Sequence, residues 1–202
     1  MAVLATPGVY GLPIASNPDA IRSSGSRTLS QVVNATRSLT TYWPGVTPIR
    51  TSISNWVLPS AWTLEAWFKG TGLTSNRAVL SAWNTNGPML WLMAANGHPG
   101  LHVNGTDVDT GVVPTNGVWY HLVGTYDGTT LAVYLQGAQK ATTTGITPVS
   151  GATPLITYNY AGSGVADILA SIRDPATYTR ALTAAEVAQH YNASAYAIPA
   201  FA

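Results

Sequence analysis

Apolar and polar residues alternate most regularly in residues 117–137, GVWYHLVGTYDGTTLAVYLQG. In an extended chain, odd-numbered residues of 119–125 share one face and even-numbered residues of 120–126 share the other. The dipeptide Asp127-Gly128 follows, which is typical of a tight turn, and residues 131–135 then alternate again. The pattern predicts a β-hairpin. Its Asp127 is expected to form the turn, and His121 to be a hydrogen-bonded strand residue.

The same period of two recurs along the chain, bounded by glycine or by Asn-Gly pairs. It predicts further strands at 62–70, 78–83, 89–94, 100–103, 155–160 and 166–172. Strands at this spacing, separated by Asn-Gly and Asp-Gly turns, indicate an antiparallel sandwich. Near the end the period changes, because Thr183 and Glu186 form a capping box with Leu182 and Val187 placed as a hydrophobic staple. A short helix is predicted over 184–191.

Residues 1–60 differ from the rest, since they are rich in Ser, Thr and Pro and show no clear period. The sequence therefore divides into an extended N-terminal arm (1–60), a β-sandwich (61–192) and a C-terminal tail (193–202). Such a composition is poorly ordered unless something binds it. The arm either pads its own domain or reaches over a neighbouring subunit, and the second alternative is favoured.

The amino-acid composition argues against several kinds of binding partner. Of 202 residues only 8% are charged and the net charge is +1, so neither nucleic acid nor an acidic surface is indicated as a partner. The absence of cysteine excludes disulfides and thiolate chemistry. The N-terminal residues lack the features of a secretory signal, and no stretch is long enough to span a membrane. Sequons at Asn34, Asn104 and Asn192 are therefore expected to be chance matches.

Four segments stand in an order that resembles a known family: WTLEAWFKG (62–70), AVLSAWN (78–84), GVWYHLVGTYDGTTLAVYLQG (117–137) and YTRALTAAEVAQHY (178–191). Together they are similar to the concanavalin A-like lectin/glucanase superfamily, in particular its laminin-G-like domains. The resemblance implies an all-β, two-sheet antiparallel jelly-roll sandwich in which the hairpin sits in the core and the helix closes over the sheet. It also implies that Trp119 of the hairpin is a core residue. It implies no single activity, because the fold hosts many.

Two departures from the family pattern matter. Pro175 interrupts the strand that precedes the helix, so this strand is expected at an edge or broken there. Gln136 replaces an aspartate in the turn after the hairpin, so acidic groups that serve calcium or the turns in relatives are partly missing.

Catalytic chemistry is not indicated. Glycoside hydrolysis needs two carboxylates flanking the sugar, and the chain has only two glutamates, Glu65 and Glu186, of which the second is explained by the capping box. His98 and His102 are spaced like helical metal ligands, but Gly and Pro around them exclude a helix. No serine stands in a nucleophile-elbow context. The chain is predicted not to be an enzyme.

Oxygen ligands alternate at one loop, where Asp107 and Asp109 follow Asn104. They are candidate calcium ligands, although no twelve-residue calcium loop is present and a solvated turn is the favoured interpretation. No cofactor is expected.

Carbohydrate binding is a second candidate. Aromatic faces with neighbouring amides are provided by Trp83, Asn84, Trp91, Asn96 and Tyr158, and further aromatic side chains by Trp43, Trp56, Trp67 and Tyr160. A sandwich with seven tryptophans can also bury most of them as core.

These observations predict a non-enzymatic structural protein of a virion-like assembly, such as a phage capsid decoration or fibre protein. The arm would anchor it to its own copies and to a capsid or tail protein, and its location would be the virion. The alternative is a lectin-like module that recognises cell-surface glycans. Neither nucleic acid nor a membrane is an expected partner.

Overall fold

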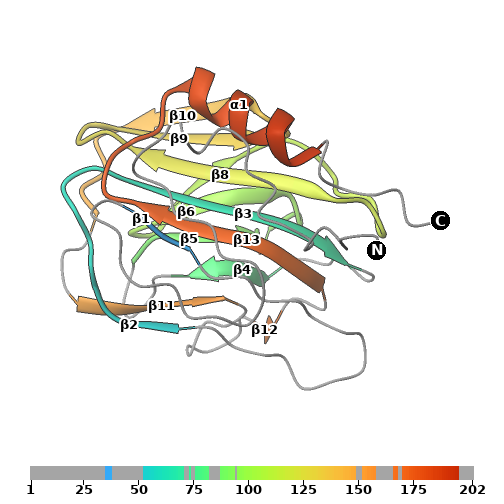
Figure 1. The fold of residues 1–202 in the computed structure, drawn as a ribbon, viewed down its shortest axis with the longest axis horizontal. Coiled ribbons are helices and arrows are strands. Elements are labelled where there is room, and N and C mark those ends of the chain that lie inside the picture. The colour runs from blue at the N-terminus through green and yellow to red at the C-terminus, as the bar shows by residue number, and fades with distance from the viewer. Residues whose placement is uncertain are drawn as a thin grey trace, which may run out of the picture.

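The structure is a computed structural model of the chain. It describes residues 35–37, 52–70, 73, 76–81, 87–93, 95–148, 152–157, 166–167 and 170–195. Two sheets face each other and one helix lies against the outside of the first sheet, as Figure 1 shows. This confirms the predicted all-β sandwich with a single short helix among the described residues.

The first sheet, here called sheet A, has six strands in the order β1-β13-β3-β8-β9-β10. Their bounds are β1 Ala35–Arg37, β13 Ala170–Tyr178, β3 Trp62–Gly70, β8 Tyr120–Tyr126, β9 Thr130–Leu135 and β10 Ala138–Thr144. All of its neighbouring strands pair antiparallel.

The second sheet, sheet B, has seven strands, six of which follow the order β2-β11-β4-β5-β6-β7. These are β2 Ser52–Val57, β11 Ala152–Thr157, β4 Arg77–Ser81, β5 Met89–Leu92, β6 Pro99–Val103 and β7 Thr106–Asp109. The seventh, β12 Ala166–Asp167, pairs parallel with β4.

The predicted hairpin is present as β8 and β9. Asp127 turns the chain, because its carboxylate accepts hydrogen bonds from the amides of Thr129 and Thr130 at 2.8 and 2.7 Å. These amide bonds lower the pKa of Asp127. Gly128 follows with a φ of 104°, which a residue with a side chain rarely adopts.

Leucine, valine and aromatic side chains from the facing sides of the two sheets form the core. The even-numbered residues of β8 point into it, as the alternation predicts: Tyr120, Leu122 and Tyr126 belong to the core cluster. Gly124 lies at the same face, where a Cβ would stand 2.7 Å from Leu101 Cδ1 and 3.1 Å from Leu90 Cδ2. The hairpin needs glycine there because sheet B approaches so closely.

Helix α1 runs over Ala184–Ala195 and lies across β8, β9 and β10 in Figure 1. Its capping box forms as predicted: the Thr183 amide donates to Glu186 at 2.8 Å and the Glu186 amide donates to the Thr183 hydroxyl at 3.3 Å. Both staple residues, Leu182 and Val187, are buried against the outer face of sheet A.

Two features differ from the expectations, and one expectation is resolved between its alternatives. Strands β1 and β2 fall within residues 1–60, so the sheets include backbone that the prediction assigns to the arm. Strand β13 pairs on both sides, so it is not an edge, but the expected interruption at Pro175 is present: the register shifts between Arg173 and Ala176, where Asp174 has a φ of 47°. A bulge thus accommodates the proline. Strand β10 was not predicted, because AQKATTT is polar and mostly exposed.

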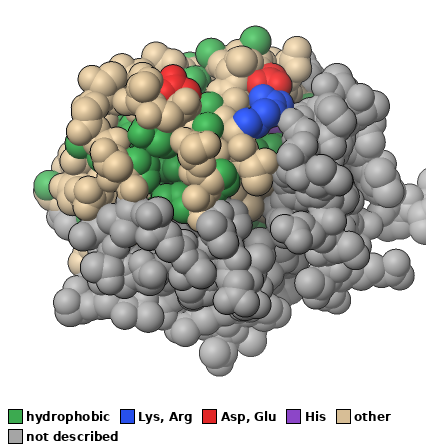
Figure 2. All heavy atoms as spheres, turned by 90° about the vertical axis from the view of Figure 1, so that its left-hand side faces the viewer, with side chains coloured by type: hydrophobic (Ala, Val, Ile, Leu, Met, Phe, Trp, Pro, Cys, Tyr) green, Lys and Arg blue, Asp and Glu red, His purple; other side chains and the backbone are tan. Residues whose placement is uncertain are grey.

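The surface carries few charges. On the face shown in Figure 2, red and blue side chains are sparse and green apolar side chains lie between tan ones. This agrees with the 8% of charged residues in the chain.

Candidate functional site

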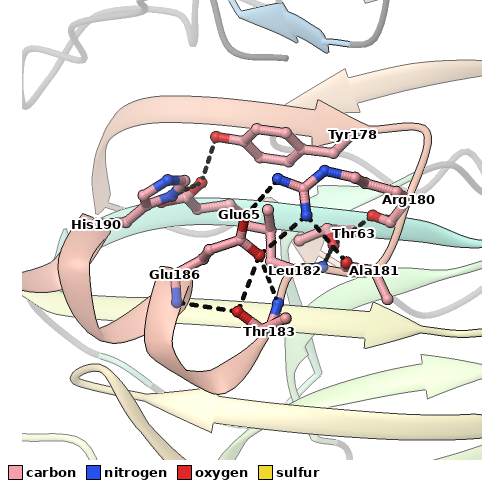
Figure 3. Close-up of polar contacts among 9 residues, drawn as sticks. All are labelled: Thr63, Glu65, Tyr178, Arg180, Ala181, Leu182, Thr183, Glu186 and His190. Carbon is pink, nitrogen blue, oxygen red and sulfur yellow. Dashed lines mark hydrogen bonds and ion pairs between the residues drawn. The ribbon is translucent and has the colours of Figure 1, made fainter. Parts of the chain in front are cut away.

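Within the described residues, ionisable side chains gather on the outer face of each sheet. On sheet A the centre is Glu65 of β3, which is fully buried. His121 Nε2 lies 2.9 Å from Glu65 Oε1, and the Tyr178 hydroxyl donates to Oε2 at 2.9 Å. From α1, His190 Nδ1 lies 3.2 and 3.1 Å from the two carboxylate oxygens. Figure 3 shows His190 and Tyr178 pointing at the same carboxylate.

Aromatic rings enclose this cluster. Trp67 packs on His121 with ring centroids 4.9 Å apart and stacks on Tyr191 of α1 at 5.6 Å and 14°. Gly137 lies directly below Tyr191, where a Cβ would be 2.9 Å from Tyr191 Cβ. The helix therefore rests on the sheet through rings and through a shared carboxylate. This Glu65 cluster joins α1 to sheet A, and its carboxylate is only 1% exposed.

A second set of bonds holds the start of the helix. Arg180 pairs with Glu186 through two hydrogen bonds of 2.9 and 2.6 Å. The Arg180 guanidinium, with help from the Thr183 amide and hydroxyl, lowers the pKa of Glu186 to about 2. Beneath them the Thr63 hydroxyl donates to the Arg180 carbonyl and accepts from the Leu182 amide, both at 2.9 Å (Figure 3).

The outer face of sheet B carries a different set of groups. At the end of β7, Asp109 lies with its two carboxylate oxygens 3.1 Å from His98 Nδ1. The Asn96 amide donates to Asp109 at 2.9 Å and the Gly111 backbone amide donates at 2.7 Å. Partial burial raises the pKa of Asp109, but these bonds outweigh it, and the pKa ends below its usual value. The carboxylate is therefore ionised at neutral pH.

A second histidine–carboxylate pair lies on the same face of sheet B, two residues before Asp109 on β7. His102 of β6 is directly opposite Asp107 of β7, and its Nδ1 lies 2.6 Å from Asp107 Oδ1. The side chains of Asp107 and Asp109 are 33% and 35% exposed, against 1% for Glu65. Trp91 of β5 meets His102 edge-on at 5.1 Å. We call Asn96, His98, His102, Asp107 and Asp109 the β6–β7 ladder.

The tautomer of His98 follows from its partner. An ionised carboxylate only accepts hydrogen bonds, so the Nδ1 atom that faces Asp109 carries the proton. In the neutral ring Nε2 is then an acceptor, and no hydrogen bond to it occurs within the described residues. The ladder can thus offer both donors and acceptors to a hydroxylated ligand.

The three calcium candidates, Asn104, Asp107 and Asp109, make hydrogen bonds to different kinds of partner. The carboxylates of Asp107 and Asp109 face histidines, whereas Asn104 forms a turn with a φ of 47° and donates its side-chain amide to the Thr147 carbonyl at 3.2 Å. Within the part of the chain that the structure describes, no group of three His, Cys, Asp or Glu residues could hold a metal ion.

The predicted glycan residues are only partly brought together. Asn96 joins the β6–β7 ladder and Trp91 lies beside it, but the indole of Trp91 is buried with 6% exposure. Trp83, Asn84 and Tyr158 lie outside the described residues, as do Trp43 and Tyr160. Trp67 is buried.

Two predictions for the central hairpin differ in outcome. His121 is a buried, hydrogen-bonded strand residue, as predicted. Trp119 is not a core residue: it precedes β8, is half-buried and lies on the outer face of sheet A. The reason is parity, because Trp119 shares the outward face with His121. Sequence reasoning also missed the contact between Glu65 and His190. The only signal for it is that the side chains of Glu65 and His121 both point outward from sheet A, toward the helix.

Comparison with known proteins now places the chain. A laminin-G family model, described as the concanavalin A-like lectin/glucanases superfamily, matches residues 45–188. The chain belongs to this superfamily, and the resemblance found in the sequence is confirmed. No curated protein matches the sequence.

Solved structures show the same fold at low identity. The binding domain of Paraclostridial Mosquitocidal Protein 1 matches with a TM-score of 0.56 and 16% identity over 69% of this chain and 38% of that one. Domain 4 of AbnA, a GH43 extracellular arabinanase from Geobacillus stearothermophilus solved with arabinotriose, matches with a TM-score of 0.56 and 19% identity over 76% and 86%. The botulinum neurotoxin serotype D binding domain matches with a TM-score of 0.53 and 12% identity over 78% and 46%.

The chain thus spans well under half of the first of these proteins and most of the second. At 12–19% identity these matches show a shared fold. Among the described residues, no helix has the length and apolar character needed to cross a membrane.

Proposed function

We propose that the chain is a non-catalytic carbohydrate-binding module, and that the β6–β7 ladder is its binding surface. The observation that carries the proposal is the ladder itself. It presents two histidine–carboxylate pairs and an amide on one sheet face, and all five side chains keep some exposure. Sugars are recognised by such planar donors and acceptors, because each can bond a hydroxyl in a fixed direction.

The likeness to AbnA Domain 4 supports this proposal. That domain was solved with arabinotriose, and the match covers nearly all of it. A whole domain of this size and fold can therefore serve as a sugar-binding unit. The match is too distant to carry over individual residues.

The positions of the carboxylates give little support to a catalytic function. Glu65 is buried within its own cluster and Glu186 is paired with Arg180, so neither stands across an open site from a second carboxylate. Asp107 and Asp109 are each bonded to a histidine. We therefore include the absence of enzymatic activity in the proposal.

The test is a glycan array probed with the full chain, followed by titration calorimetry with arabinotriose and with any sugar the array identifies. We expect micromolar to millimolar binding to neutral sugars, which Asp109→Asn lowers about tenfold through the loss of one charge-assisted bond. Lys140→Ala, on the exposed strand β10, is the matched control and leaves affinity unchanged. Binding that survives Asp109→Asn intact would move the site elsewhere, and silence against all sugars would overturn the proposal.

A role in a virion-like assembly stays a prediction from the sequence, together with the virion location. It is favoured by the low share of charged residues, which suits packing between subunits, and by the Ser/Thr/Pro-rich arm. Removal of residues 1–34 spares β1 and β2. If the arm anchors an assembly, sedimentation velocity shows fewer subunits per particle for this variant than for the full chain. An unchanged number of subunits contradicts the anchoring role.

A further inference from the structure

Four Asn-Gly pairs occur in the chain, at 86–87, 96–97, 104–105 and 116–117. The structure describes both residues of the last three. An asparagine before glycine is chemically reactive, because the backbone nitrogen of the glycine can attack the carbon of the side-chain amide, and glycine has no Cβ to hinder the approach. In a folded protein the reaction depends on the hydrogen bonds that hold this nitrogen and this amide.

The Asn96-Gly97 pair is held at both residues. Gly97 is buried, and its amide donates to the Met93 carbonyl at 2.8 Å. The Asn96 side chain donates to Asp109 at 2.9 Å and accepts from the His98 amide at 2.9 Å, so both of its polar atoms are bonded. Attack at this pair requires that these bonds break first.

The Asn116-Gly117 pair is held in a similar way. The Gly117 amide donates to the Gly70 carbonyl at 2.8 Å. The side-chain oxygen of Asn116 accepts from the Leu73 amide at 2.9 Å. A backbone amide that donates to a carbonyl gives up its proton only when the structure opens locally, which is why such amides exchange hydrogen slowly. The same opening is needed before the Gly117 nitrogen can attack.

The Asn104-Gly105 pair differs from the other two. It forms the two-residue turn between β6 and β7, with φ values of 47° and 78°, and both residues are exposed. No hydrogen bond from the Gly105 amide occurs within the described residues, and a Cβ at Gly105 would meet no atom within 4 Å. The Asn104 side chain makes one bond, from its nitrogen to the Thr147 carbonyl at 3.2 Å. The attacking nitrogen and its target are thus both accessible to water.

We propose that Asn104 is a site of spontaneous deamidation, which the fold favours at this turn and suppresses at the other two described pairs. Hydroxide removes the proton of the Gly105 amide, the nitrogen bonds to Cγ of Asn104, and the Cγ–Nδ2 bond breaks with release of ammonia. Water then adds to one of the two carbonyl carbons of the resulting five-membered imide and cleaves the bond from that carbon to nitrogen. In sum, the amide and water give a carboxylate and ammonium, and no atom is oxidised or reduced.

The modification changes the charge at one end of the β6–β7 ladder. Cleavage at Cγ gives an aspartyl residue, whereas cleavage at the backbone carbonyl carbon gives an isoaspartyl residue, in which the chain continues through Cγ. Either product places a carboxylate in the turn three residues before Asp107 and removes the amide that donates to Thr147. Because the ammonia is lost to solvent, the turn gains this charge irreversibly. The proposal does not depend on sugar binding.

The test is peptide mass spectrometry of the full chain after prolonged incubation in warm, mildly alkaline buffer. Conversion replaces NH₂ by OH, and the resulting mass difference is measured at Asn96, Asn104 and Asn116 in the same sample. We expect Asn104 to convert at least tenfold faster than either of the others, because only their reaction requires local opening. Equal rates at the three asparagines, slower conversion at Asn104, or no conversion at Asn104 would each overturn the proposal.

Two controls separate the effect of the fold from other causes. In concentrated urea the hydrogen bonds at all three pairs are lost, so we expect the three rates to become similar. An equally large excess at Asn104 in urea would show that the local sequence, not the fold, selects the site, and would overturn the proposal. Asn104→Gln should abolish the mass change in the peptide that contains the turn, because attack on the longer side chain needs a less favourable six-membered ring. A mass change that persists would assign the modification to another residue and contradict the proposal.

Discussion

The outer faces of the two sheets use the same pair of side chains, histidine and carboxylate, for different purposes. On sheet A, Glu65 is fully buried, and its partners come from β8, β13 and α1, between 56 and 125 residues away. On sheet B, Asp107 and Asp109 stay about one-third exposed and meet histidines only 5 and 11 residues away. A buried carboxylate with long-range partners joins elements, whereas an exposed one with local partners remains available to a ligand.

The difference between the two faces is tested most strongly by a substitution of Glu65. Glu65→Ala leaves His121, His190 and Tyr178 buried without their shared acceptor, and we expect it to lower the free energy of unfolding by about 3–5 kcal/mol. Urea unfolding followed by tryptophan fluorescence measures this. Asp107→Ala is the matched control on the other sheet, with an expected loss below about 1 kcal/mol. Equal losses at the two sites would refute the distinction between the faces.

A smaller effect is expected at the helix. His190→Ala removes the contact from α1 to the buried carboxylate and should cost about 1.5–3 kcal/mol, typical of a hydrogen bond to a charged group. Amide hydrogen exchange should also accelerate over 184–195 relative to β8. Gln189→Ala, an exposed neighbour on the same helix, should change neither quantity. A helix that exchanges at the same rate in both variants is not clamped by His190.

The start of the helix should respond to pH. The pKa of Glu186 is about 2, below its ordinary value of about 4.3, so its stabilisation is present above about pH 4.3 and is lost as the pH falls toward 2. Both partners are partly exposed, so we expect about 1 kcal/mol. Thermal unfolding of Glu186→Gln should show a deficit at pH 7 that becomes smaller as the pH falls toward 2. A deficit independent of pH would assign the effect to the lost cap alone.

The smallest effect on stability belongs to the β6–β7 ladder. Asp107→Asn keeps the size of the side chain and removes its charge, and we expect the free energy of unfolding to change by less than about 1 kcal/mol. Chemical denaturation at pH 7 measures it. A loss as large as that of Glu65→Ala would show that the ladder holds the sheet together.

Local patterns in the sequence predict local structure well here. The alternation before Asp127, the turn itself and the Thr183–Glu186 capping box all appear in the structure because each depends on residues within a few positions. The alternation also predicts that the side chains of β8 divide between two faces, although it does not say which of the two is the core. The same logic fails for β10, because an exposed edge strand needs no apolar face.

Long-range contacts could not be predicted in this way. The contact between His190 and Glu65 depends on the packing of α1 on sheet A, and nothing near Glu65 in the sequence indicates it. The family resemblance assigns Trp119 to the core, although its outward parity places it beside Lys69 and Arg173. On sheet B, Asn96 and Asp109 were each identified separately, but only the pairing of β6 with β7 makes them one surface.

We propose that the face of sheet B binds ligand, whereas the face of sheet A holds the helix. This is tested by titration of a neutral glycan identified on the array into Asp107→Asn, with the unfolding free energy taken on the same sample. We expect at least a tenfold loss of affinity at nearly unchanged stability. Unchanged affinity, or a loss of affinity that only accompanies a loss of stability, would contradict it.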